Sequence, residues 1–181
     1  MKLNKWKTPL LIIGWLVVII LTIMFLQSPG MRFFGSMIKD VVKTRQIRDR
    51  LLSQTDHKAL LDACREISKE VSEGNLSPNR YSVRYKPDPG ISQFPQLVLD
   101  VEPLYIDVSS DGRVTLEISG AFHHCGVTAY PENYEKPNEH FKYEDKMIID
   151  GLWYYEDGYN PKRDDKWIES MINKGKRRRE N

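Results

Sequence analysis

The residues of this chain best suited to chemistry are three in a row, His123, His124 and Cys125. Imidazole nitrogens and thiolate sulfurs are ligands that zinc prefers, and a closed zinc site needs about four of them. On a β-strand His123 and Cys125 would share one face and His124 would point to the other, so one face supplies only two ligands. Packing residues at a strand edge explain the same cluster and are the commoner outcome. A metal site would need a further ligand from His57, Cys64 or His140.

Cys64 and Cys125 are the two cysteines of the chain. Cys64 lies in a segment with helical periodicity and Cys125 in an extended segment that would cover it, so a disulfide between them is sterically reasonable. Such a bond needs Cα atoms within about 4.4 to 6.8 Å of each other, and it persists only in an oxidising compartment. In the cytoplasm the same residues would be ordinary buried thiols. The sequence leaves both alternatives open.

An aromatic cluster, GLWYYEDGY, occupies residues 151–159. Carbohydrate and peptide sites use aromatic faces of this kind, but strands also bury aromatic side chains to build a core. Alternation on a strand would place Trp153 and Tyr155 in the core and Tyr154 outside. The core interpretation is favoured, and Tyr154 and Tyr159 are the candidates for an exposed ligand surface.

The motifs of several common enzyme classes are absent from the sequence. There is no Walker loop, no Gly-x-Ser-x-Gly, no His-Glu-x-x-His and no EF-hand loop, so we do not expect an enzyme, and no cofactor is implied. The net charge is +2, but three lysines precede residue 27 and the tail after residue 173 holds five basic residues against one acid, so residues 27–173 carry −5. This mildly acidic body argues against a nucleic-acid partner.

A charge-free run of seventeen residues, LLIIGWLVVIILTIMFL, extends from Leu10 to Leu26. As a helix that rises 1.5 Å per residue it would span about 25 Å, enough to cross a bilayer when flanking residues help at its ends. We interpret residues 1–27 as an uncleaved signal anchor, because the run exceeds the apolar core of a signal peptide and Ser28-Pro29-Gly30 is a poor cleavage site. A cleaved secretory signal is the alternative.

The lysines before the run set its expected direction in the membrane. Lys2, Lys5 and Lys7 form a tight cluster, whereas the basic residues after the run are more widely spaced and only Arg32 is close. The positive-inside rule therefore favours a single pass with a cytoplasmic N-terminus and an extracytoplasmic folded part. In a bacterium that location is the periplasm or the cell surface.

Two further helices are expected after the run. Residues 28–55 carry an apolar stripe at helical spacing with lysines and arginines on the other faces, which predicts a juxtamembrane amphipathic helix. It would either pack on the folded domain or lie on anionic lipid headgroups as a surface sensor. For the next helix Ser53, Thr55 and Asp56 are available as N-caps, and Gly74 supplies a stop.

From Asn79 onward the periodicity becomes alternating, which predicts an antiparallel sheet. Its best signal is the segment LYIDVSSDGRVTLEIS, in which Asp111-Gly112 forms the turn of a hairpin. A bulge is expected at Gly120. Residues 166–173 suggest a short helix. The expected organisation is an anchor at 1–27, a juxtamembrane helix at 28–55, an α+β soluble domain at 56–173 and a basic disordered tail at 174–181.

Two stretches, DHKALLDACREI at 56–67 and DGLWYYEDGY at 150–159, together resemble small membrane-anchored bacterial proteins that have no assigned activity. The resemblance implies an anchored domain and carries over no site residue. The plan of N-terminal span, helix and antiparallel sheet is also similar to that of pilins and pseudopilins. The sequence departs from that family because the Gly-Phe-Thr-Leu-Ile-Glu type of processing site is absent before the span.

The sequence therefore predicts an α+β fold with an N-terminal transmembrane helix, two further helices and a sheet of antiparallel hairpins. We expect an interaction or structural module at the membrane, whose partners are the lipid bilayer, through Leu10–Leu26, and other membrane or envelope proteins. The alternative is a small envelope enzyme or metal-binding protein that uses His123, His124 and Cys125.

Overall fold

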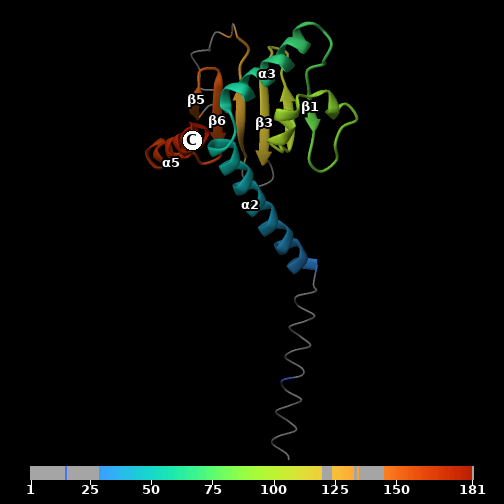
Figure 1. Ribbon diagram of the computed structural model, residues 1–181. Coiled ribbons are helices and arrows are strands. Elements are labelled where there is room, and N and C mark those ends of the chain that lie inside the picture. Colours follow the sequence, from blue (N-terminus) through green and yellow to red (C-terminus); the bar gives the residue numbers. More distant parts are fainter. Residues whose placement is uncertain (1–14, 16–28, 120–123, 133, 135–144, 181) are drawn as a thin grey trace, which may run out of the picture. The chain divides into compact units, whose positions relative to one another are not determined.

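The computed structural model describes residues 15, 29–119, 124–132, 134 and 145–180 (Figure 1). The chain divides into two compact units, Met1–Lys43 and Thr44–Asn181. In the second unit helices pack on an antiparallel sheet, which confirms the α+β class predicted from the sequence.

Two helices, α2 (Pro29–Ser53) and α3 (His57–Ser72), occupy the segments where the sequence predicts them. Proline suits the first position of α2 because its missing N–H would have no partner there. Of the three candidate N-caps for α3, Asp56 is the one used, since its side chain accepts hydrogen bonds of 3.0 and 3.1 Å from two backbone N–H groups of the first turn. The predicted stop is also correct: just beyond α3, Gly74 has a φ of +77°, which glycine adopts without strain.

The described residues form one six-stranded antiparallel sheet in the order β1-β2-β3-β4-β6-β5. The hairpin predicted around Asp111-Gly112 is confirmed as β2–β3, and Gly112 has a φ of +82°. The pairing of β3 with β4 shifts register between Glu117 and Ser119, while the bulge predicted at Gly120 lies outside the described residues. The strands are β1 (Asn79–Ser82), β2 (Tyr105–Val108), β3 (Val114–Ser119), β4 (Cys125–Ala129), β5 (Lys146–Ile149) and β6 (Leu152–Glu156).

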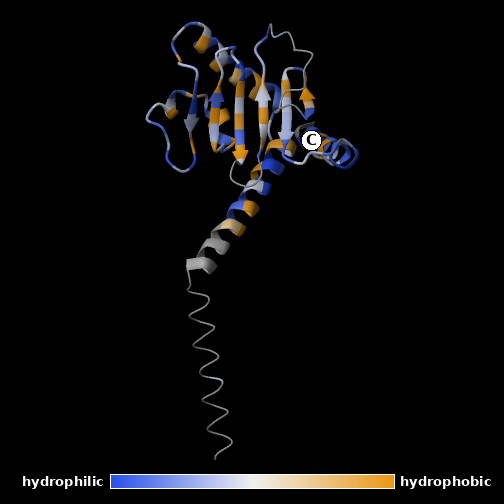
Figure 2. Ribbon diagram, turned by 180° about the vertical axis from the view of Figure 1, so that it is seen from behind, coloured by the Kyte–Doolittle hydropathy of each residue, from blue (hydrophilic) through white to orange (hydrophobic). Residues whose placement is uncertain are grey.

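The core lies between one face of the sheet and the helices. α3 crosses this face (Figure 1), and its Leu60 and Cys64 are fully buried. A row of side chains at matching register crosses the central strands and is also fully buried: Ile106, Leu116, Val127 and Tyr154. Each large apolar side chain buried in this way stabilises the fold by about 1.5–3 kcal/mol. Figure 2, seen from behind, shows hydrophobic and hydrophilic residues alternating along the strands.

The proline-rich stretch between β1 and β2 lies in the segment from Asn79 onward that is predicted to form sheet, but it contains two short helical segments. They are the 3-10 helix η1 (Ile91–Gln93) and α4 (Gln96–Asp100). Phe94, between them, is 4% exposed and meets the ring of Tyr81 edge-on at 5.0 Å, so this stretch closes the core beside β1.

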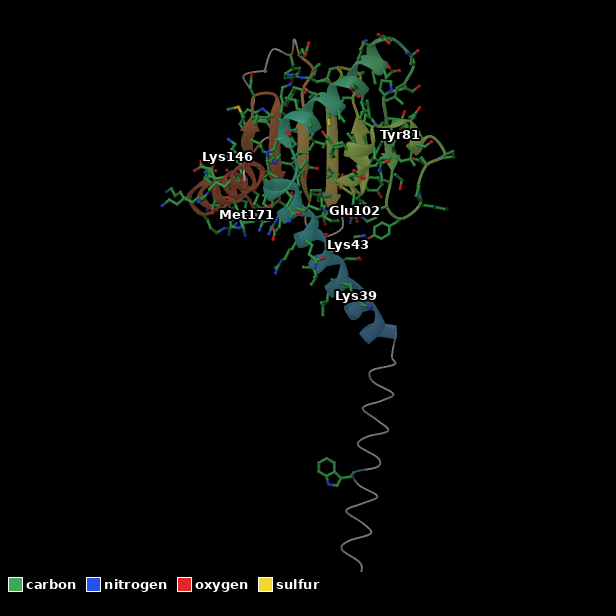
Figure 3. All side chains as sticks on the ribbon, in the orientation of Figure 1. Lys39, Lys43, Tyr81, Glu102, Lys146 and Met171 are labelled. Atoms are coloured by element: carbon green, nitrogen blue, oxygen red, sulfur yellow. The ribbon has the colours of Figure 1, made fainter. Side chains whose placement is uncertain are left out.

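The last helix, α5 (Pro161–Glu180), is longer than the sequence suggests. The tail at 174–181, predicted to be disordered, is helical up to Glu180. Lysine and arginine are good helix formers, and Ile168 and Ile172 of the same helix are buried in the core. In the middle of the helix, Glu169 accepts a hydrogen bond of 2.8 Å from Lys146 of β5 (Figure 3). Near its end, Gly175 lies against the backbone of Ser53.

No helix among the described residues has the length and hydropathy needed to cross a membrane. The predicted anchor, Leu10–Leu26, lies outside those residues except for Trp15, which is exposed.

Candidate functional site

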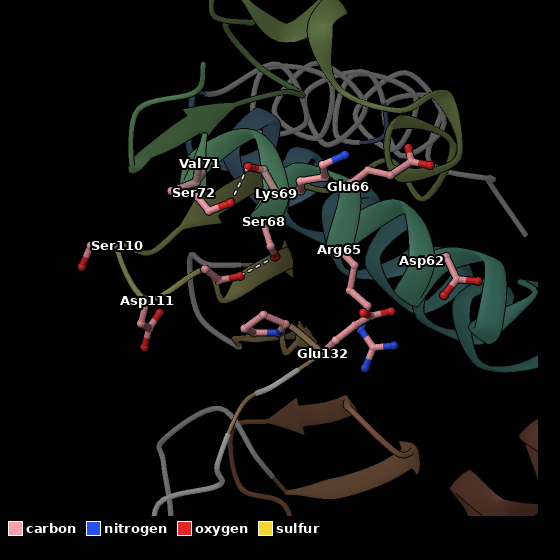
Figure 4. A pocket seen from close by; sticks show the side chains of 12 residues that line it. Asp62, Arg65, Glu66, Ser68, Lys69, Val71, Ser72, Ser110, Asp111 and Glu132 are labelled. Atoms are coloured by element: carbon pink, nitrogen blue, oxygen red, sulfur yellow. Dashed lines mark hydrogen bonds between the residues drawn. The ribbon is translucent and has the colours of Figure 1, made fainter. Parts of the chain in front are cut away.

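An open groove of about 690 Å³ lies between α3 and the β2–β3 turn (Figure 4). Ligand pockets in proteins typically measure about 300–1,000 Å³, so the groove has the size of a binding site. α3 forms one wall, and the turn together with the two residues after Tyr130 forms the other.

Ser68 holds the two walls together. Its Oγ lies 2.5 Å from the carbonyl oxygen of Gly112 in the turn and 3.1 Å from that of Cys64 in its own helix. Ser68 is 8% exposed, so water competes little for these contacts. A second tie runs from the Nε of Arg65, which donates to the carbonyl oxygen of Tyr130 at 3.2 Å. The groove is therefore fixed by hydrogen bonds at both of its walls.

Acidic side chains outnumber basic ones along the groove. Among the acids, Asp62 pairs with Lys58, and Asp111 accepts a hydrogen bond of 2.8 Å from Arg113. Glu66 is exposed and has no hydrogen bond or ion pair with any residue that the structure describes, and the same holds for Glu132. The groove thus presents two carboxylates with unused acceptor capacity. Its charged lining residues are Asp62, Arg65, Glu66, Lys69, Asp111 and Glu132.

The predicted metal cluster is not assembled by the part of it that the structure describes. His123 and His140 lie outside the described residues. Cys125 is fully buried on the helix-covered face, where burial raises the pKa of its thiol to about 12, so the thiolate that a metal needs is disfavoured. His57 is also buried and donates to a backbone carbonyl of α2 at 2.9 Å. No three His, Cys, Asp or Glu side chains gather into a metal site among the described residues.

His124 contributes instead to a polar cluster with residues that the sequence did not single out. Glu117 of β3 is 6% exposed; its Oε2 accepts from Arg80 Nη2 at 2.5 Å, and its Oε1 accepts from His124 Nδ1 at 3.1 Å. The Arg80 guanidinium stacks 4.0 Å from the centre of the Tyr105 ring. A carboxylate oxygen accepts, so Nδ1 is the donor in this contact.

Cys64 and Cys125 are both free thiols, so the disulfide allowed by the sequence is not formed in the structure. α3 crosses the sheet at the end where Ser68 meets Gly112. Cys125 begins β4 at the opposite end of the sheet. It lies four residues before Ala129, so about 13 Å of strand, at about 3.3 Å per residue, separates it from the end that α3 crosses. Burial also raises the pKa of Cys64 to about 12.

Tyr154 and Tyr159, predicted as an exposed ligand surface, are both engaged within the domain. The prediction that Tyr154 points outward is wrong: it is fully buried, and its O–H donates to Glu156 at 2.6 Å. Tyr155, on the other face of β6, is only 2% exposed, so both faces of this strand are covered and an aromatic pattern cannot tell them apart. Tyr159 is partly buried and donates to Asp165 of α5, and burial raises its pKa.

Sequence reasoning missed the groove because none of its residues carries a local signal. Glu66 and Lys69 look like the solvated side of an ordinary amphipathic helix, and only the approach of the β2–β3 turn makes them a wall. Comparison of the chain with models of protein families, with curated proteins and with solved structures finds no match.

Proposed function

We propose that this chain is a single-pass, membrane-anchored interaction module. The observation that carries the proposal is the charge-free run Leu10–Leu26. Near the bilayer centre each Leu, Ile, Val or Phe favours insertion by about 0.3–0.6 kcal/mol, which sums to several kcal/mol with no charge opposing it. The lysine cluster before the run supports a cytoplasmic N-terminus and an extracytoplasmic domain. The partners are the lipid bilayer and another membrane or envelope protein.

The groove beside α3 is the surface that we assign to the protein partner. Glu66 and Glu132 favour a ligand that brings lysine or arginine side chains, since a carboxylate binds such a donor through a charge-assisted hydrogen bond. Arg65 and Lys69 line the same groove and would repel an unbroken basic run. The ligand is therefore a segment of the partner with separated lysines or arginines.

Alkaline carbonate extraction of membranes tests the anchor. The full chain should remain in the pellet, whereas Ile19→Arg with Ile20→Arg should move it to the supernatant, because each arginine costs about 2.5–3.5 kcal/mol near the helix centre. The matched control, Ile19→Leu with Ile20→Leu, should stay in the pellet. Release of the unaltered chain by carbonate would contradict the anchor.

Crosslinking from inside the groove tests the binding surface. A photoreactive amino acid at Ser110, which is exposed on the turn, should give one discrete adduct in intact membranes. Glu66→Lys with Glu132→Lys should abolish this adduct. Glu70→Lys, an exposed change on α3 outside the groove lining, should preserve it. An adduct that survives the double change would rule out recognition by these carboxylates.

One contact supports a second candidate function, metal binding by a small envelope protein. Metal-binding histidines commonly donate their other ring nitrogen to a carboxylate, and His124 donates Nδ1 to Glu117 in this way. Metal analysis of the purified full chain should then find a bound transition metal that His124→Ala removes. Equal metal content in both forms would exclude this role for His124.

A further inference from the structure

α2 leaves a cluster of apolar side chains exposed. Ile38, Val41 and Val42 are 63%, 50% and 48% exposed, and they are three of the six large hydrophobic residues exposed among the described ones. Isolated exposed apolar residues are normal, but several together on one helix mark an interaction surface. With the half-buried Met37 they form what we call the α2 seam: Met37, Ile38, Val41 and Val42.

Helical geometry gathers the α2 seam on one side of the helix. At about 100° per residue its four members span an arc of about 140°. The charged residues Lys39, Asp40 and Lys43 fall on the remaining arc, and all three are exposed. Figure 3 labels Lys39 and Lys43, which lie one helical turn apart on α2. The seam itself carries no charge.

The sequence spacing of the seam is that of a coiled coil. Ile38 and Val41 are three residues apart. Upstream, position 34 is a phenylalanine four residues before Ile38, and position 31 is a methionine three residues before that, so the spacing between apolar residues alternates between three and four. Apolar residues at this spacing take the a and d positions of a heptad, through which two helices pack side by side. The charged residues then take the outer positions b, c and f.

A second helix fits this surface better than a lipid surface does. Arg45 takes the next place in the row after Ile38 and Val41, so a helix lying on lipid would hold its guanidinium at the centre of the lipid-facing side. Against an identical helix Met37, Ile38, Val41 and Val42 meet only uncharged side chains. Arg45 then takes a single a position beside its counterpart, which costs some stability but is tolerated because its long side chain reaches the water beside the pair. Lys39 and Lys43 then stay in water without facing their counterparts.

We propose that the α2 seam binds the α2 seam of a second copy of this chain, with the two helices parallel. The parallel direction rests on the proposed anchor, because two copies held by Leu10–Leu26 enter α2 from the same membrane. The seam is short for a coiled coil in solution. Confinement of both copies to one bilayer raises their effective concentration and compensates for this shortness.

Disulfide trapping of the full chain in its own membranes tests the proposal. Single cysteines are introduced at two seam positions, Ile38→Cys and Val41→Cys, and at two outer positions, Lys39→Cys and Lys43→Cys. The native Cys64 and Cys125 are buried and serve as the common background. After mild oxidation, non-reducing electrophoresis should show several-fold more covalent dimer for the seam cysteines than for the outer ones.

Equal dimer at all four positions, or none at any, would overturn the proposal. If no dimer forms and the cysteine of Ile38→Cys is also shielded from a water-soluble maleimide, the proposal is overturned and the seam is assigned to lipid. The membrane content of each sample is measured by sedimentation in parallel. A chain found in the supernatant contradicts the proposed anchor, while the contrast between seam and outer cysteines still decides the self-association.

Discussion

Arg48 of α2 donates through Nη1 to Glu156 Oε1 of β6 at 2.9 Å. The other oxygen of the same carboxylate accepts the O–H of Tyr154 at 2.6 Å. The guanidinium of Arg48 also lies 4.5 Å from the centre of the Trp167 ring in α5. One arginine therefore joins the C-terminal part of α2 to the sheet and to the last helix.

Removing the carboxylate from this contact should weaken the domain. We predict that Glu156→Ala lowers the free energy of unfolding by about 2–3 kcal/mol, somewhat below the cost of about 3–5 kcal/mol for a fully buried pair. The discount reflects the remaining exposure of the two side chains, 20% and 12%. Urea unfolding of the full chain in detergent micelles measures the effect. Lys58→Gln, which breaks a more exposed pair with Asp62, should change stability by no more than about 0.5 kcal/mol.

The two buried thiols predict a loss of stability at alkaline pH. Burial raises the pKa of Cys64 and of Cys125 from 9.0 to about 12, so the folded state holds these protons more tightly than the unfolded state. Their contribution is complete below about pH 9 and is lost as the pH rises toward 12. Each thiol should cost about 1 kcal/mol between pH 8 and pH 10. Urea unfolding at both pH values should show a smaller loss for Cys64→Ala and for Cys125→Ala, and an unchanged loss would contradict this origin.

Counting thiols without reductant tests whether these cysteines are free. Both are buried, so the folded chain should react with a thiol reagent only slowly. In denaturant two thiols per chain should react at once. No reaction in denaturant until a reductant is added would show that Cys64 and Cys125 form the disulfide after all.

Gly175 should not tolerate a side chain. In an exposed helix Gly→Ala adds about 1 kcal/mol of stability, but here an added Cβ would collide with the backbone oxygen of Ser53. We expect Gly175→Ala to lower the free energy of unfolding by about 1–3 kcal/mol, as overpacking typically does. Lys176→Ala, at the exposed neighbouring position, should stay within about 0.5 kcal/mol. Stabilisation by Gly175→Ala would contradict the close packing of α5 on α2.

The sequence predicts those elements that have local signals. The turn at Asp111-Gly112, the N-cap at Asp56 and the stop at Gly74 all appear where turn and cap chemistry demands. The periodicity that predicts a helix over 28–55 likewise matches α2.

The errors and omissions fall where distant segments meet. The outward direction of Tyr154 was wrong because β6 buries side chains on both faces. α5 continues past residue 173, where Gly175 lies against Ser53, a residue far away in the sequence. The groove forms where Ser68 meets Gly112. The pairing of Glu117 with His124 depends on the register of β3 and β4. No local sequence pattern therefore predicts either site.

Protease accessibility of the Thr44–Asn181 domain in a bacterial host tests the central claim of a membrane-anchored module most directly. The account predicts that the domain sediments with membranes, is protected in intact cells and is digested once only the outer barrier is opened. Protection until the inner membrane is permeabilised would place the domain in the cytoplasm and contradict the assigned orientation. Recovery of the intact, uncleaved chain in the soluble fraction would contradict the anchor itself.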